Sequence, residues 1–293
     1  MLTHKLDALA TDHKKALLLL AAAATMWSLG GLLVKLIDWN PMAIAGMRSA
    51  IAGLTMYLMT GRRPRFSWSA NQLGGAVAYV GTVTFFVVAT KLTTAANAVL
   101  LQYTAPIYIA LLSYWFVKER TTRFDWIIVA LTIGGMLLFF IDDLELGTFW
   151  GNSFGVLSGV SFGLFILCMR RQKDGSPMET VIIGNGLTAL VCLPFMFDSP
   201  PDLRGWISLA LLGTLQLGLP YIIYSITIKH VTALEAVLIP VIEPILNPVW
   251  VFLAIGERPG LWTLAGGAVV ITAVTAHSIV RSSRQHHARK KYG

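Results

Sequence analysis

Long apolar blocks alternate with short polar segments along almost the whole chain. A helix needs about 20 mostly apolar residues to cross a lipid bilayer. By that measure the blocks predict ten spans, over residues 15–35, 41–60, 72–90, 94–117, 124–141, 151–170, 177–197, 205–228, 232–255 and 261–281. The apolar residues within each block are continuous rather than alternating, which favours helices over the strands of a barrel. The pattern therefore predicts an all-α polytopic membrane protein.

The first block also carries features of a secretory signal. Lys14 and Lys15 precede it, and the alanines 22–24 resemble a signal-peptidase site. The uncharged stretch 16–34, however, is as long as a full span and longer than a usual signal core. We therefore expect an uncleaved first span.

Composition agrees with a membrane protein and narrows the chemistry. Hydrophobic residues make up 55% and charged residues 13% of the chain, whereas soluble proteins carry about 25% charged residues. The net charge of +8 lies in short clusters between apolar blocks, so it predicts membrane topology rather than a nucleic-acid surface. Cys168 and Cys192 lie inside apolar blocks, without metal-binding or haem-binding spacing. We expect no cofactor, no metal and no nucleic-acid partner. Because the chain lacks a glycine-rich phosphate loop, we also expect no ATP-driven step.

The distribution of basic residues predicts the orientation of the chain in the membrane. If the N-terminus lies inside, the inside segments carry 18 Lys and Arg residues and the outside segments carry 4. The four outside residues are Lys35, Lys91, Arg204 and Arg258. Cytoplasmic segments are enriched in basic residues, so both termini are expected in the cytoplasm. Tryptophans at the block ends are expected at the membrane interfaces, and they are Trp39, Trp68, Trp126, Trp150, Trp206 and Trp262.

The chain contains an internal repeat. Residues 91–120 match residues 229–258 at a constant offset of 138, which pairs Pro106 with Pro244. Each half holds five spans, an odd number, so the halves must enter the membrane in opposite directions. The expected domains are a first repeat over 15–141, a second repeat over 151–281 and a basic cytoplasmic tail over 282–293.

These residues give the chain a resemblance to the EamA-type transporters of the drug/metabolite transporter superfamily. The matching features are Trp27-Ser28 with Gly30, Arg48, Lys91–Ala95, Pro106 followed by Glu119-Arg120, Glu243-Pro244, Glu257-Arg258 and Gly266-Gly267. The resemblance covers residues 16–280 and implies ten helices in two inverted repeats. It also implies export of small metabolites, often amino acids, across the bacterial inner membrane. Aromatic amino-acid exporters of the YddG kind are the nearest interpretation.

Polar and aromatic residues deep in the spans are the candidates for substrate binding. A cavity for an amphipathic solute needs apolar walls and a few hydrogen-bonding groups. The candidate substrate-binding residues are Trp27, Tyr79, Gln102, Tyr103, Ser161, Gln216, Tyr221, Glu243 and Asn247. Each of them singly is also explained by hydrogen bonding between packed helices. The expected partners are a small-molecule substrate and the lipid bilayer, with the chain acting as a monomer.

Two charged residues inside spans leave several interpretations open. Glu243 lies near the middle of the ninth span, where an ionisable group is costly and indicates function. It either binds a proton or a substrate amine, or it hydrogen-bonds backbone groups freed by nearby prolines. Arg48 either pairs with Glu243, binds a substrate carboxylate, or extends its side chain to the outer interface.

Prolines and glycines predict where the helices bend and pack. Proline removes a backbone hydrogen bond and kinks a helix, so proline-containing spans are the expected moving elements. These prolines are Pro106, Pro220, Pro240, Pro244 and Pro248. The sixth span has glycines at a strict spacing of four, which predicts a close-packed ridge. These glycines are Gly151, Gly155, Gly159 and Gly163.

The pattern favours a transporter over other membrane proteins. The expected function is export of small amphipathic metabolites by alternating access around a central cavity, with proton-coupled export of drugs as the alternative. An intramembrane enzyme would need clustered catalytic groups, whereas the only acidic cluster is the loop with Asp142, Asp143 and Glu145. A channel would show polar stripes along several helices, and too few are present. The chain is therefore not expected to be an enzyme.

Overall fold

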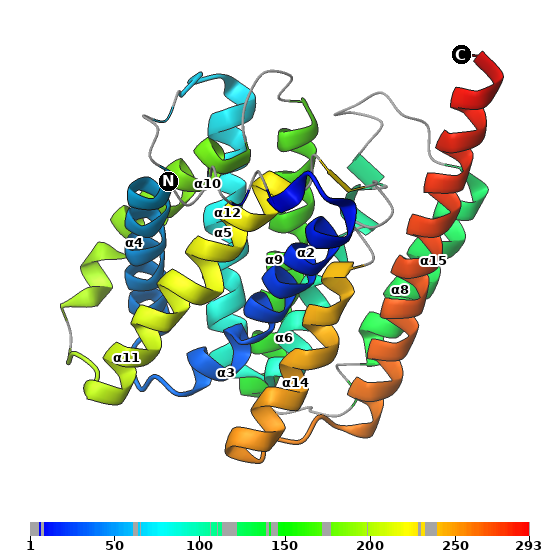
Figure 1. The fold of residues 1–293 in the computed structure, drawn as a ribbon. Coiled ribbons are helices and arrows are strands. Elements are labelled where there is room, and N and C mark those ends of the chain that lie inside the picture. The colour runs from blue at the N-terminus through cyan, green and yellow to red at the C-terminus, as the bar shows by residue number, and fades with distance from the viewer. Residues whose placement is uncertain are drawn as a thin grey trace.

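The computed structural model describes residues 6, 9–60, 64, 66–105, 107–109, 111–112, 122–138, 141, 146–171, 177–197, 199–227, 230–231 and 239–292. The longer helices are α2 (His13–Ser28), α3 (Gly30–Lys35), α4 (Pro41–Thr60), α5 (Ala70–Leu92), α6 (Ala95–Gln102), α8 (Arg123–Leu138), α9 (Leu146–Arg171), α10 (Pro177–Cys192), α11 (Leu203–Leu211), α12 (Leu219–Thr227), α14 (Ile242–Ile255) and α15 (Leu261–Tyr292). Three short turns complete them: the 3₁₀ helices η1 (Leu193–Met196) and η3 (Ile239–Val241), and the π-helix η2 (Leu212–Gly218). Figure 1 shows the helical bundle.

The helices begin where side chains can accept hydrogen bonds from the first free amides. Ser69 accepts from Gln72 N before α5, Thr94 accepts from Asn97 N before α6, and Asp202 accepts from Gly205 N before α11. In the part of the chain that the structure describes, six segments are long and apolar enough to cross a membrane. They are His13–Lys35, Pro41–Thr60, Ala70–Leu92, Thr148–Met169, Met178–Met196 and Leu203–Thr227. Three shorter apolar helices, Trp126–Gly135, Ile239–Ile255 and Leu261–Ala273, lie in three further predicted spans. The predicted all-α polytopic class is confirmed.

The two halves of the chain run in opposite directions. The second helix of the first half, α4, packs against the second helix of the second half, α10. Near the start of α4, Gly46 lies against Cys192, and near its middle, Gly53 lies against Asn185. At the end of α4, Thr60 Oγ1 lies 3.7 Å from Met178 Sδ at the start of α10. Because these equivalent helices are antiparallel, the predicted inversion of the repeats is confirmed.

The glycine ridge of α9 packs inside the chain. A Cβ added at Gly151 would lie 2.7 Å from Thr93 N, and one added at Gly159 would lie 2.7 Å from Leu101 O. The same face continues through Gly155, against Leu101, and Gly163, against Ala105 and Tyr108. The four glycines therefore let α9 approach the backbone of α6 and of the segments beside it.

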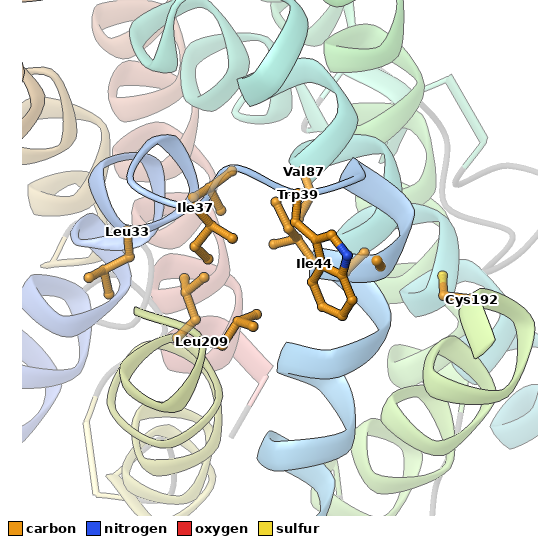
Figure 2. Packing of buried hydrophobic residues seen from close by; sticks show 11 residues of the cluster. Leu33, Ile37, Trp39, Ile44, Val87, Cys192 and Leu209 are labelled. Carbon is orange, nitrogen blue, oxygen red and sulfur yellow. The ribbon is translucent and has the colours of Figure 1, made fainter. Parts of the chain in front are cut away.

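Buried apolar side chains fill the end of the bundle where α3 and α4 are joined. Figure 2 shows Leu33, Ile37, Trp39, Ile44, Val87, Cys192 and Leu209 of this cluster. Trp39 is 8% exposed, and its ring centroid lies 6.1 Å from that of Trp206. Trp39 therefore packs between helices, and its place at a membrane interface stays a prediction. The other five predicted tryptophans are exposed.

Within the described residues, three spans are interrupted, two of them beside prolines. Pro220 has no N–H to donate to the carbonyl of Gln216. The π-helix η2 ends at Gly218, two residues before Pro220. Pro240 lies in the 3₁₀ helix η3, directly before α14. The first span breaks at Leu29, between α2 and α3, without a proline. Pro106, expected to bend the fourth span, lies outside the described residues.

One helix pair stands at the edge of the bundle. Helices α8 and α15 pack on each other at the right of Figure 1. Between them lies an apolar pocket of about 400 Å³, lined by Ile128, Leu131, Ala268, Val269, Thr272, Ala273 and Ala276. None of these residues is a candidate for substrate binding, so this pocket does not coincide with the candidate site.

Candidate functional site: a central cluster joining both repeats

Aromatic rings from both repeats meet beside the break in the first span. The Trp27 ring of α2 lies 5.4 Å from the Tyr221 ring and 5.5 Å from the Tyr224 ring, both of α12. The Tyr79 ring of α5 lies 5.9 Å from the Tyr221 ring, edge-on. Trp27, Tyr221 and Tyr224 are only partly buried. Rings with apolar faces and polar edges are suited to an amphipathic solute.

Tyr103 and Glu243 connect α6 of the first repeat to α14 of the second. The Tyr103 hydroxyl lies 2.9 Å from Glu243 Oε2 and 2.9 Å from Pro240 O, to either of which it can donate. Pro244 explains why the Pro240 carbonyl has no backbone partner. In a regular helix, residue 244 would donate its N–H to the carbonyl of residue 240, and proline has no N–H. Glu243 and Tyr103 are both partly exposed. The carboxylate is therefore held by a hydroxyl, in a residue that is not fully buried.

Two amide side chains lie against the glycines of the first-span break. A Cβ added at Gly30 would lie 2.8 Å from Gln216 Nε2, and one added at Gly31 would lie 2.9 Å from Asn247 Nδ2. Gln216 Nε2 also donates to Trp27 O, at 3.3 Å. Within the described residues, several buried polar atoms of Trp27 and of these two amides lack hydrogen-bond partners. They are Trp27 Nε1, Gln216 Oε1, Asn247 Oδ1 and Asn247 Nδ2. Buried polar atoms are usually paired, so this concentration points to ligand binding.

We call these residues the central cluster: Trp27, Tyr79, Tyr103, Gln216, Tyr221, Tyr224, Glu243 and Asn247. The sequence singled out all of them except Tyr224 as substrate-binding candidates. It missed the nearby bond in which Trp250 Nε1 donates to Ser28 Oγ at 2.8 Å, because neither residue type signals a partner across helices.

The other two substrate-binding candidates, Gln102 and Ser161, make contacts between helices. Gln102 Nε2 donates to Ser158 Oγ at 2.8 Å, and Ser158 Oγ donates to Thr82 O at 2.9 Å. Ser161 lies against Gly81 of α5. Within the central cluster, Tyr79 OH donates to Asn185 Oδ1 at 3.3 Å. Gln102 and Ser161 therefore join α9 to its neighbours.

Arg48 is buried rather than extended to an interface. It is 1% exposed, and its Nη2 donates to Val83 O at 2.9 Å. The guanidinium carbon lies 6.0 Å from the Phe86 ring centroid, within cation–π range. Arg48 makes no ion pair within the described residues, so the expected alternatives of pairing with Glu243 and of reaching the interface are both wrong.

A second polar group joins the repeats near the ends of α3 and α14 and the start of α6. Lys35 Nζ lies 2.8 Å from Glu257 Oε2, and Glu257 Oε1 accepts from Ala95 N at 2.8 Å. Lys35 Nζ also donates to Thr93 O at 2.8 Å. Deeper in this group, Asn97 Nδ2 donates to Asn152 Oδ1 at 3.0 Å, and Asn97 Oδ1 accepts from Thr263 Oγ1 at 2.8 Å.

We call this group the Lys35 network: Lys35, Thr93, Ala95, Asn97, Asn152, Glu257 and Thr263. Two signals in the sequence point to it, namely the repeat match at Glu257 and the motif at Lys91–Ala95. The sequence did not pair them, because Lys35 and Glu257 are 222 positions apart in the printed sequence. Among the described residues, no group of three or more His, Cys, Asp or Glu side chains could hold a metal ion.

The model of the EamA-like transporter family matches residues 14–141 and 149–278. The chain belongs to the EamA-like transporter family. Its two matched segments are the two repeats, and an EamA-like chain of this architecture is a multi-pass membrane transporter.

Curated relatives of this EamA-like chain carry transporter names. An uncharacterized transporter of Archaeoglobus fulgidus is 31% identical over 69% of this chain and 74% of its own length. The uncharacterized transporter YdfC of Bacillus subtilis is 30% identical over 63% of this chain and 62% of its own length. The pseudopaline exporter CntI of Pseudomonas aeruginosa is 25% identical over 62% of this chain and 66% of its own length. A solved crystal structure covering 93% of this chain has a TM-score of 0.63 at 20% identity, which supports the fold alone.

Proposed function

We propose that this EamA-like chain exports small amphipathic metabolites across a bacterial inner membrane, with aromatic amino acids as the favoured substrates. The central cluster carries the proposal, because helices of both repeats supply partly exposed rings and a carboxylate to it. Rings offer faces to an apolar side chain, and unpaired polar atoms offer hydrogen bonds to the head group of an amino acid. One relative is named an exporter, which supports the direction of transport.

Alternating access is the proposed mechanism, with both termini in the cytoplasm. In that orientation Lys35 and Glu257 lie at the outer end of the bundle. Their ion pair and the Ala95 bond join the first repeat to the second, so the described state is closed at this end. Opening to the outside separates these groups, while the interrupted spans beside Pro220 and Pro240 provide the bending points. The chain acts as a monomer in this proposal, with the lipid bilayer as its solvent and without a cofactor.

Counterflow in proteoliposomes tests the proposal. The purified chain is reconstituted and preloaded with unlabelled tryptophan, and the uptake of labelled tryptophan is followed; phenylalanine, leucine and aspartate are tested in the same way. We expect saturable uptake that is fastest for tryptophan and phenylalanine. Uptake equal to that of protein-free liposomes for every amino acid would overturn the proposal.

A proton-coupled exporter of drugs is the second candidate, and Glu243 is the observation that favours it. A carboxylate near the middle of a span can carry a proton across the membrane when it alternates between the two sides. Efflux of ethidium from proteoliposomes, with and without an imposed pH gradient, separates the two candidates. Ethidium efflux driven by the gradient, without amino-acid counterflow, would establish this second candidate.

A further inference from the structure

Arg48 is a buried cation whose only described hydrogen-bond acceptor is a backbone carbonyl. A guanidinium has five N–H donors. One of them donates to Val83 O, whereas Arg48 Nε has no hydrogen-bond partner in the described part of the chain. Removing a charge from water is costly, and more so when its partner is missing, so buried charges are normally paired. The bond to Val83 O therefore satisfies neither the charge nor the remaining N–H donors of the Arg48 side chain.

The guanidinium lies beside the central cluster, between helices of both repeats. Arg48 is on α4, and its acceptor Val83 is one turn after Tyr79 on α5. Val83 packs in one apolar cluster with Tyr79 of α5 and Tyr221 of α12. Tyr221 is partly exposed and contacts the Trp27 ring at 5.4 Å. An anionic group at Arg48 would therefore lie next to the rings that suit an apolar side chain.

Among the described residues, no carboxylate forms an ion pair with Arg48. The carboxylate deepest in the described spans, Glu243, accepts from Tyr103 instead. Glu257 pairs with Lys35 at the far end of α14. Arg48 also differs from a snorkelling arginine, because its side chain is fully enclosed.

We propose that Arg48 binds the carboxylate of the transported solute, so that the substrates are carboxylic acids with an aromatic or apolar body. This inference rests on the proposed export function and specifies its substrate class. A guanidinium binds a carboxylate by donating two parallel N–H···O bonds to its two oxygens. A single backbone carbonyl has one oxygen and cannot accept this pair of bonds. Arg48 is buried in the described state, so in this proposal the carboxylate reaches it when α12 moves away from α4 and α5. The π-helix η2 directly before α12 is the local irregularity that permits this movement.

Counterflow with analogues lacking the carboxylate tests the inference on the wild-type chain. Tryptophan, tryptophanamide and tryptamine share the indole ring, but only tryptophan carries a carboxylate. We expect tryptophan to be transported at least about tenfold faster than both analogues, because a site built to bond a charged group rejects a solute without it. Equal transport of the three solutes overturns the role of Arg48 and leaves the export function intact. Absence of flux for every solute overturns the export function and the inference with it.

Substitution separates substrate binding from packing. We expect Arg48→Gln to lose the preference for tryptophan over tryptophanamide, and Arg48→Lys to keep part of it, since the charge remains. Thermal unfolding of each variant in detergent checks that the chain is folded. If folded Arg48→Gln slows all solutes equally and keeps the tryptophan preference, Arg48 is a packing residue only. If Arg48→Gln does not fold, the wild-type comparison of the three solutes decides.

Discussion

Two polar groups join the repeats, and they differ in how completely their hydrogen bonds are made. In the Lys35 network, the charged and amide groups of Lys35, Asn97 and Glu257 have partners in the described residues. In the central cluster, Trp27, Gln216 and Asn247 keep polar atoms without one. A fully paired polar group is rigid and holds helices together, whereas unpaired buried atoms are costly to keep. The difference supports the roles proposed above, with closure by the Lys35 network and solute binding by the central cluster.

Gly31 stands between the two groups, and filling its place is expected to have the largest effect. A Cβ there would contact Asn247 of the central cluster and lie 2.8 Å from the Ala95 Cβ of the Lys35 network. Overpacking costs about 1–3 kcal/mol and shifts backbone, so Gly31→Val should abolish counterflow. The matched control is Gly134→Val, because a Cβ at Gly134 meets nothing within 4 Å. Normal counterflow by Gly31→Val would show that the two groups are not coupled through this contact.

The Lys35 network is tested next by removing the Glu257 charge. Glu257→Gln keeps an oxygen for Ala95 N but loses the ion pair with Lys35. Bonds to charged groups contribute about 1.5–3 kcal/mol, so the open state should become about tenfold more populated. The measurement is the labelling of Tyr224→Cys in intact cells by a membrane-impermeant maleimide. Cys168 and Cys192 are buried, so the chain without Tyr224→Cys gives the background.

Glu179→Gln is the control for that experiment. Glu179 lies in the first turn of α10, near the end of α4, at the opposite end of the bundle from Lys35. Removing its charge should leave outside labelling of Tyr224→Cys unchanged. An equal rise in both variants would mean that loss of any carboxylate loosens the bundle, and the Lys35 network would lose its role in closure.

Within the central cluster, Glu243→Gln is expected to reduce transport several-fold. The variant keeps the oxygen that accepts from Tyr103 but cannot ionise. If Glu243 carries a proton, wild-type flux responds to an imposed pH gradient, and the flux of the variant does not. Tyr103→Phe is the comparison, because it removes the bond and keeps the carboxylate. Normal flux of Glu243→Gln at every pH gradient would exclude Glu243 as the coupling group.

The sequence predicted the fold better than it predicted the site. Apolar block length is a local property, so the spans, and the five-plus-five inversion derived from them, follow from the chain alone. Pairing between distant helices is not local, and the bond of Lys35 to Glu257 and that of Trp250 to Ser28 were missed. Residue type also does not tell whether a buried amide is paired. Gln102 and Gln216 looked alike in the sequence, and they differ in the structure.

These two glutamines give the smallest and most specific test of the comparison. Gln102 is paired with Ser158, whereas Gln216 Oε1 is unpaired. Replacing Gln102 by Leu leaves the Ser158 hydroxyl without this donor, so it should lower the free energy of unfolding by about 1–3 kcal/mol. The half-saturating tryptophan concentration should stay unchanged. Replacing Gln216 by Leu removes an unpaired oxygen, which offsets much of the lost bond to Trp27 O. It should therefore change stability little and raise the half-saturating concentration about threefold or more, roughly the loss of one neutral hydrogen bond. The opposite assignment, with Gln102 controlling substrate affinity, would move the solute site to the face of α6 that contacts α9.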